Sequence, residues 1–319
     1  MSKEFPRKEV YVYTSKKQLD SSKVTAIHDK GELILPDYLE NYAQMRWNYD
    51  NNGWISSVIP SMVDVEISQG GNLMKFRCAT TKYHKLLGMV KLATERGKTE
   101  DKDIVHGLSI ETVPIFSDDT VIFEQRQSAS TQHGVGFYDF PSASQNAKMY
   151  LKKAEEKYPG LVRDMFDMEG FPRFHILKAF EQLNPTQIGP INYVGLSRGF
   201  EVSLDSQVNS YTNLPIESGE VMTNGENRLV YKTNSLLDVF NSIGKSNPKE
   251  DIHGKKPGHA PQTGGFLIVD DCLGTILSTL YHTKGIETYN DAIEVLQLRG
   301  YKINKVFPKE GVINLNYLV

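Results

Sequence analysis

Residues 169–185, EGFPRFHILKAFEQLNP, have the pattern of a loop that leads into an amphipathic helix. Pro172 suits the first helical turn, where a missing N–H costs no hydrogen bond. Lys178, Glu181 and Gln182 lie three and four residues apart, so they share one polar face. Apolar side chains recur at helical spacing on another face: Phe174, Leu177, Phe180 and Leu183. The stretch therefore predicts a helix that buries one face against a core.

The composition is that of a globular chain. It has 319 residues, enough for one large domain or two smaller ones, and a net charge of −3 that gives no general attraction to nucleic acid or anionic membranes. No apolar run reaches the length of a signal peptide or the roughly 18 residues of a spanning helix. The two cysteines, Cys78 and Cys272, fit a reducing compartment. We therefore expect a cytoplasmic protein without nucleic-acid or membrane partners.

The first hundred residues predict a small α+β unit. Residues 36–49 and 83–96 have helical patterns, and Gly70-Gly71 separates two apolar strands in the manner of a hairpin turn. The charged run ERGKTEDKD over residues 95–103 marks a boundary. We predict an N-terminal α+β subdomain over residues 1–104 and a second domain over residues 105–319.

The second part alternates strands and helices, which predicts an α/β fold. Its predicted strands cover residues 107–116, 120–127, 191–196, 200–204 and 228–232. Its predicted helices cover residues 144–158, 172–183, 235–243, 272–281 and 288–300, and the tail has the alternation of one more strand.

The loop and helix at residues 169–185 resemble the box of the Nudix family. That box has a glutamate, seven residues and then Arg-Glu-hydrophobic-x-Glu-Glu-x-Gly, and its carboxylates hold a divalent metal against a diphosphate. Glu169 fits the first glutamate and Glu181 fits one of the later pair. The chain departs from the box at four positions. Leu177 stands at the arginine and Lys178 at the glutamate that follows it. Gln182 stands at the second glutamate of the later pair, and Asn184 at the glycine.

The order of the surrounding segments also resembles that family. Residues 121–126, ending in Arg126, fit the arginine-containing hairpin strand, and residues 136–141 and 191–196 fit the strands before and after the box. The resemblance covers roughly residues 107–232. It implies a Nudix-like α/β/α sandwich with a mixed sheet.

This resemblance implies metal-assisted attack of water on a diphosphate. Glu169 and Glu181 would be the catalytic residues and the ligands of Mg²⁺ or Mn²⁺, while Arg126, Lys178 and Gln182 would contact the ligand. The ligand class would be a nucleotide or a nucleoside-diphosphate-linked small molecule. Lys178 would lie about one turn from Glu181 and neutralise it. We therefore expect weak or lost activity as a magnesium-dependent nucleoside-diphosphate-X pyrophosphohydrolase.

Three alternatives stay open from the sequence. The chain could be a non-catalytic binding or interaction protein that keeps only the fold. The helix at residues 169–185 could also be an ordinary core helix with a solvated polar face. The chain could also be an active hydrolase whose carboxylates lie outside the box, at Asp139, Asp164 and Asp167. His253, His259 and Cys272 lack the spacing of a zinc site, so no zinc is expected there. A homodimer is left open.

Overall fold

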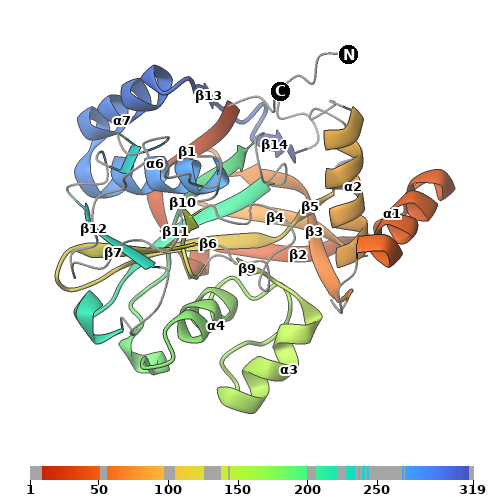
Figure 1. Cartoon of the computed structure of the whole chain (residues 1–319), viewed down its shortest axis with the longest axis horizontal. Coiled ribbons are helices and arrows are strands. Elements are labelled where there is room, and N and C mark those ends of the chain that lie inside the picture. Colours follow the sequence, from red (N-terminus) through yellow and green to blue (C-terminus); the bar gives the residue numbers. More distant parts are fainter. Residues whose placement is uncertain are drawn as a thin grey trace.

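The computed structural model shows a mixed α/β protein built from three sheets and the helices that cover them (Figure 1). It describes residues 9–50, 56–96, 105–125, 138–142, 144–199, 206–221, 228–233, 237, 239–240, 243, 268 and 270–315. The α/β class predicted from the sequence is confirmed.

The central sheet has six strands in the order β13-β1-β10-β11-β6-β9. In chain order they are β1 (Glu9–Asp20), β6 (Ser109–Ile115), β9 (Ser144–Gln145), β10 (Asn192–Gly199), β11 (Ser206–Asn213) and β13 (Lys302–Lys305). The sheet is mixed, because β1 pairs parallel with β13 and β11 parallel with β6, while β10 is antiparallel to both its neighbours. Every residue of β10 is buried, as expected for a strand covered on both faces.

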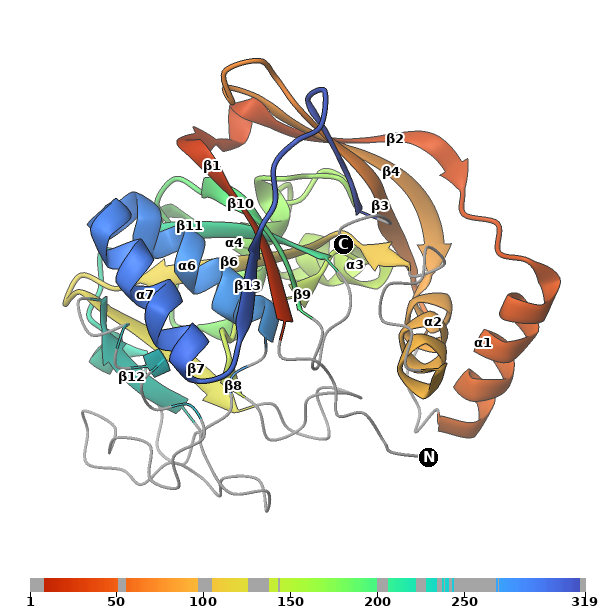
Figure 2. The same ribbon diagram turned by 90° about the horizontal axis from the view of Figure 1, so that it is seen from above.

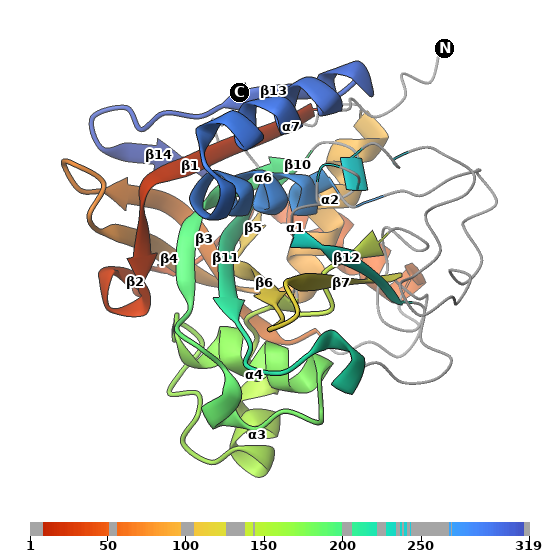
Figure 3. The same cartoon turned by 90° about the vertical axis from the view of Figure 1, so that its left-hand side faces the viewer.

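Helices cover the two faces of this sheet. Helices α6 (Asp270–Lys284) and α7 (Ile286–Leu298) lie on one side, and α4 (Gly170–Ala179) lies on the other, as Figures 1 and 3 show from two directions. Two apolar clusters reflect these layers. Leu196 and Val208 belong to the cluster on the α4 side, and Val12 belongs to the cluster on the α6 side.

A second sheet has the order β14-β3-β4-β2, and β5 also pairs with β3. Its strands are β2 (Val24–Glu32), β3 (Val58–Ile67), β4 (Met74–Lys82), β5 (His106–Gly107) and β14 (Val312–Asn314). Helices α1 (Asp37–Asp50) and α2 (Tyr83–Arg96) pack side by side next to it (Figure 2). The predicted turn at Gly70 and Gly71 is confirmed, and both glycines have the positive φ that such turns require.

The third sheet has three strands in the order β12-β7-β8. They are β7 (Thr120–Gln125), β8 (Tyr138–Asp139) and β12 (Arg228–Lys232). This small sheet matters for the site because it positions Asp139 beside the central sheet. The remaining helix described here, α3 (Lys148–Lys157), lies on the same side of the molecule as α4 (Figure 3).

The predicted boundary at residue 104 falls among residues outside the described part of the chain. Strand pairing crosses it in both directions. β1, from the N-terminal part, pairs with β10 and β13, and β14, from the C-terminal end, pairs with β3.

Several element ends differ from the sequence prediction because of contacts distant in the chain. The helix predicted to start at residue 144 begins at Lys148, since Ser144 and Gln145 pair with β6. The helix predicted over 172–183 ends at Ala179, whose carbonyl accepts a 3.0 Å hydrogen bond from Arg228. The strand predicted over 200–204, most of the helix predicted over 235–243 and Arg126 lie outside the described residues.

Candidate functional site

Helix α6 carries buried polar side chains toward the central sheet. Thr275 and Ser278 have no solvent exposure, which is uncommon for hydroxyl residues without partners. The helix lies close to the sheet at Gly274, where even a Cβ atom would overlap the Ser197 side chain of β10. This close approach brings the α6 hydroxyls within reach of the strands.

These hydroxyls join a buried hydrogen-bond network that includes side chains from four strands of the central sheet. Asn209 on β11 is its centre. Its Oδ1 accepts from the Ser197 hydroxyl at 2.8 Å and lies 2.9 Å from the Thr275 hydroxyl, while its Nδ2 donates to Ser278 Oγ at 3.3 Å. Ser278 in turn lies 3.3 Å from the hydroxyl of Thr14 on β1. Thr275 also donates to the carboxylate of Glu111 on β6.

The single hydroxyl proton of Thr275 helps to orient Glu111. This proton can serve only one acceptor at a time. Asn209 Oδ1 and the Glu111 carboxylate both lie within hydrogen-bond distance of this hydroxyl, and the carboxylate is the stronger acceptor, so Thr275 donates to Glu111. A buried carboxylate that accepts a hydroxyl proton in a fixed network has a defined orientation.

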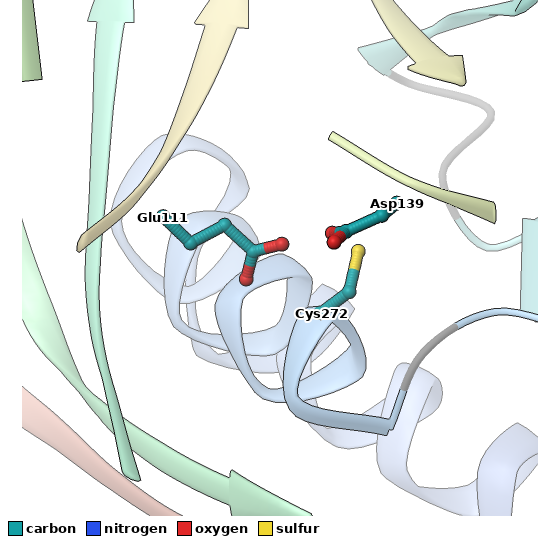
Figure 4. Close-up of side chains that lie close together, drawn as sticks. All are labelled: Glu111, Asp139 and Cys272. Carbon is teal, nitrogen blue, oxygen red and sulfur yellow. The ribbon is translucent and has the colours of Figure 1, made fainter. Parts of the chain in front are cut away.

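Glu111 lies beside two other groups that bind metals. Glu111 of β6, Asp139 of β8 and Cys272 of α6 each offer one ligand atom, and these atoms all lie within 4.8 Å of one another. In Figure 4 the two carboxylates and the thiol point toward a common centre. Glu111 and Cys272 have no solvent exposure, and Asp139 has 5%. The structure thus gathers three buried donor groups from three elements.

Backbone groups stabilise negative charge on two of the three donors. Cys272 lies in the first turn of α6, where the helix dipole stabilises a thiolate. The amide of Phe140 donates to Asp139 Oδ1 at 2.8 Å, which stabilises the ionised carboxylate. Two buried carboxylates this close together repel each other, and a cation between them would offset that repulsion.

The donor types discriminate between metals. Zn²⁺ is bound by Cys sulfur and by Asp or Glu oxygen, and three protein ligands with a fourth open position are the usual set of a catalytic zinc site. Mg²⁺ prefers oxygen ligands only. Glu111, Asp139 and Cys272 therefore fit Zn²⁺ better than Mg²⁺.

The two box glutamates are not brought together. Glu169 is the residue before the first turn of α4 and pairs with Arg173 at 3.5 Å. Glu181 lies beyond the end of α4 and pairs with Lys157 at 3.1 Å. A ten-residue helix, about 15 Å long, separates them. Within the described part of the chain, neither belongs to a group of three possible metal ligands.

The residues expected to contact a ligand are placed as follows. The ammonium of Lys178 lies 4.7 Å from the ring centroid of Tyr150, and it is Lys157 that pairs with Glu181. Glu181 is therefore paired with Lys157, which is more distant in the sequence, and not with Lys178 as expected. Gln182 is exposed, and Arg126 lies outside the described residues.

The carboxylates considered outside the box have different surroundings. Asp139 belongs to the buried centre. Asp167 accepts hydrogen bonds from the amide and guanidinium of Arg163 and from the amides of Glu169 and Gly170, and so holds the start of α4. Burial raises the pKa of Asp167, but these hydrogen bonds outweigh it and lower the pKa overall. Asp164 is exposed and accepts from the Phe166 amide at 2.7 Å.

Sequence reasoning missed Glu111 and the role of Cys272. One signal was present, because Glu111 is the only charged residue in the strand SIETVPI, and a charge in a buried strand usually has a partner. The partners lie 28 residues (111 to 139) and 133 residues (139 to 272) apart, so no short spacing joins them.

Comparison with known proteins assigns no family to this chain. No family model matches it, and the search of curated proteins returns no match. Among the helices in the described residues, none has the length and apolar character needed to cross a membrane.

Proposed function

We propose that this protein binds a divalent transition-metal ion between Glu111, Asp139 and Cys272, and that Zn²⁺ is the preferred ion. The observation that carries the proposal is the position of three buried donor atoms within 4.8 Å of one another. A cation there would attract both buried carboxylates and so stabilise their ionised forms. Neither Cys78 nor Cys272 is in a disulfide bond, which supports a reducing, cytoplasmic location where a thiolate ligand persists.

Three protein ligands leave a coordination position for water or for a ligand. Glu111 is oriented through Thr275, Asp139 through the Phe140 amide, and Cys272 through the first turn of α6. These supporting contacts correspond to the outer hydrogen bonds that orient ligands in metal sites. When bound, Zn²⁺ would polarise a bound oxygen and lower the pKa of a bound water.

The metal proposal is tested by thermal unfolding of chelator-treated protein with added Zn²⁺ or Mg²⁺. A ligand at about 100 times its dissociation constant adds about 2.7 kcal/mol to stability, which a melting experiment resolves. We expect Zn²⁺, but not Mg²⁺, to raise the Tm. Cys272→Ser and Asp139→Asn should abolish the shift, and Co²⁺ should give a thiolate charge-transfer band only when Cys272 is present.

Cys78→Ser provides the matched control. Cys78 is equally buried, and burial raises the pKa of its thiol to about 12, but it lies in the core around β4, away from the three donors. It should keep the full Zn²⁺ response. An equal response in Cys272→Ser and the parent protein would refute the proposal.

A second function concerns the helix α4. From the resemblance to the Nudix family we propose that the protein binds a nucleotide or a diphosphate-linked small molecule and hydrolyses it weakly or not at all. The position of α4 on one face of the central sheet, with α6 on the other, is compatible with an α/β/α sandwich. The separation of Glu169 and Glu181, each paired with a cation, supports the loss of hydrolysis.

A phosphate-release assay with Mg²⁺ or Mn²⁺ tests this second function. Nucleotide sugars, dinucleotides and nucleoside triphosphates would be the substrates. We expect little or no turnover, and any genuine residual turnover should disappear in Glu169→Gln. Efficient hydrolysis that survives both Glu169→Gln and Glu181→Gln would exclude the box as its source.

A further inference from the structure

A cavity of about 790 Å³ lies apart from both the metal centre and α4. Its walls come from β1, the turn between β3 and β4, the end of α6, the start of α7 and the segment 305–311. Glu111, Asp139 and Cys272 do not line it. This volume lies in the range of pockets that hold small organic ligands, about 300–1,000 Å³.

Aromatic side chains form much of this cavity. Tyr281 of α6 and Tyr289 of α7 meet edge to face with ring centroids 5.5 Å apart, and Tyr13 of β1 lines the same cavity. Phe307 is 77% exposed and Ile286 is 51% exposed, although both are large apolar residues. Exposed apolar side chains that gather around a cavity lose contact with water when a ligand enters.

The cavity also carries positive charge. Lys16 and Lys305 line it and are exposed, and Glu310 is the acidic residue of the lining. In the described residues, no carboxylate lies within ion-pair distance of either lysine. The ammonium of Lys305 lies 5.1 Å from the centroid of the Tyr289 ring, so one cation lies directly beside the aromatic wall.

We propose that this cavity binds a small molecule with a planar aromatic ring and a phosphate or carboxylate group. The ring would contact Tyr281 and Phe307, since aromatic rings attract each other edge to face or in offset stacks. The anion would lie near Lys16 and Lys305, neither of which has a carboxylate within ion-pair distance among the described residues. This site is independent of the metal centre and of the proposed metal function.

The charges separate this ligand class from neutral ones. A neutral lipid or an apolar peptide would fill the apolar part but gain nothing from the two lysines. An inorganic phosphate would meet the lysines but bury no apolar surface. The combination of aromatic wall and cations thus favours a ligand that has both features.

Fluorescence titration with flavin mononucleotide tests the proposal, because riboflavin has the same ring without the phosphate. Adenosine monophosphate, by competition, tests whether a different ring with the same anion is accepted. We expect flavin mononucleotide to bind at least about tenfold more tightly than riboflavin, from the attraction of two nearby cations for a dianion. Added salt should reduce this preference.

Three variants locate the site. Lys305→Gln and Lys16→Gln should each weaken flavin mononucleotide binding about fivefold to tenfold and leave riboflavin binding unchanged. Phe307→Ala should weaken both. Lys302→Gln is the matched control, because Lys302 lies on the same strand, is exposed and pairs with Glu9 at 3.2 Å away from the cavity.

Each outcome decides the proposal. Equal binding of flavin mononucleotide and riboflavin would remove the anion requirement. Binding of neither flavin mononucleotide nor adenosine monophosphate, or equal losses in Lys302→Gln and Lys305→Gln, would overturn the site. The Zn²⁺ response of the same preparations reports separately on the metal centre.

Discussion

The Gly274→Ala substitution should destabilise the protein although it replaces glycine by a better helix former. Gly274 lies within α6, where alanine would by propensity alone stabilise a helix by about 1 kcal/mol. In this structure the new methyl group would overlap Ser197 Cβ, lie 2.9 Å from Ser197 Oγ and 3.4 Å from Val12 Cγ2. The sign of the effect therefore depends on the packing of α6 against β10.

The magnitude follows from the space required. Ordinary van der Waals contact begins at 3.4 Å, so α6 must move by at least 3.4 − 2.9 = 0.5 Å to relieve the Oγ contact, and further to clear Cβ. Overpacking of this kind costs about 1–3 kcal/mol, occasionally more. After the helix gain of about 1 kcal/mol, we expect a net loss of about 2 kcal/mol.

Urea unfolding measures this loss through a lower midpoint at unchanged m. The double variant Ser197→Gly, Gly274→Ala removes the Cβ atom that the methyl group meets. It should lose less stability than the sum of the two single variants, since residues in contact couple. A stabilised Gly274→Ala protein would refute the proposed close packing of α6.

Two further predictions concern His175 within α4 and Glu181 just beyond its end. Burial, and then the charge of Lys178, lower the pKa of His175 from its usual 6.5 to about 3. Between these two pH values the unfolded state binds more protons than the folded state. The free energy of unfolding therefore falls as the pH decreases through this window, by up to about 1.4 kcal/mol per pH unit. Neither ring nitrogen of His175 has a hydrogen-bond partner in the described structure, so His175→Leu should raise stability at neutral pH by about 1 kcal/mol. Urea unfolding at several pH values should also show a smaller loss of stability at acid pH in this variant. An unchanged loss would contradict this. Glu181→Gln should change stability by less than about 0.5 kcal/mol, because the Glu181 and Lys157 side chains are 75% and 49% exposed; a loss above 1 kcal/mol would show a role beyond this surface pair.

The sequence by itself determined the elements with strong local patterns. Helix α2 has the predicted bounds of residues 83–96, and the hairpin at Gly70 and Gly71 is where the paired glycines predicted it. Both depend on interactions within a few residues: apolar spacing of a helix, and the positive φ that glycine adopts without strain. The α/β class followed from the same local alternation of strands and helices.

Only the tertiary structure decided how these elements meet. The parallel pairing of β11 with β6 places Asn209 opposite Glu111, and the close approach of α6 at Gly274 then adds Thr275 and Cys272. The end of α4 at Ala179, which leaves Glu181 outside the helix, involves a hydrogen bond from Arg228, 49 residues away. Such contacts join residues that are distant in the chain, so sheet register and helix packing, rather than local sequence, formed the buried centre.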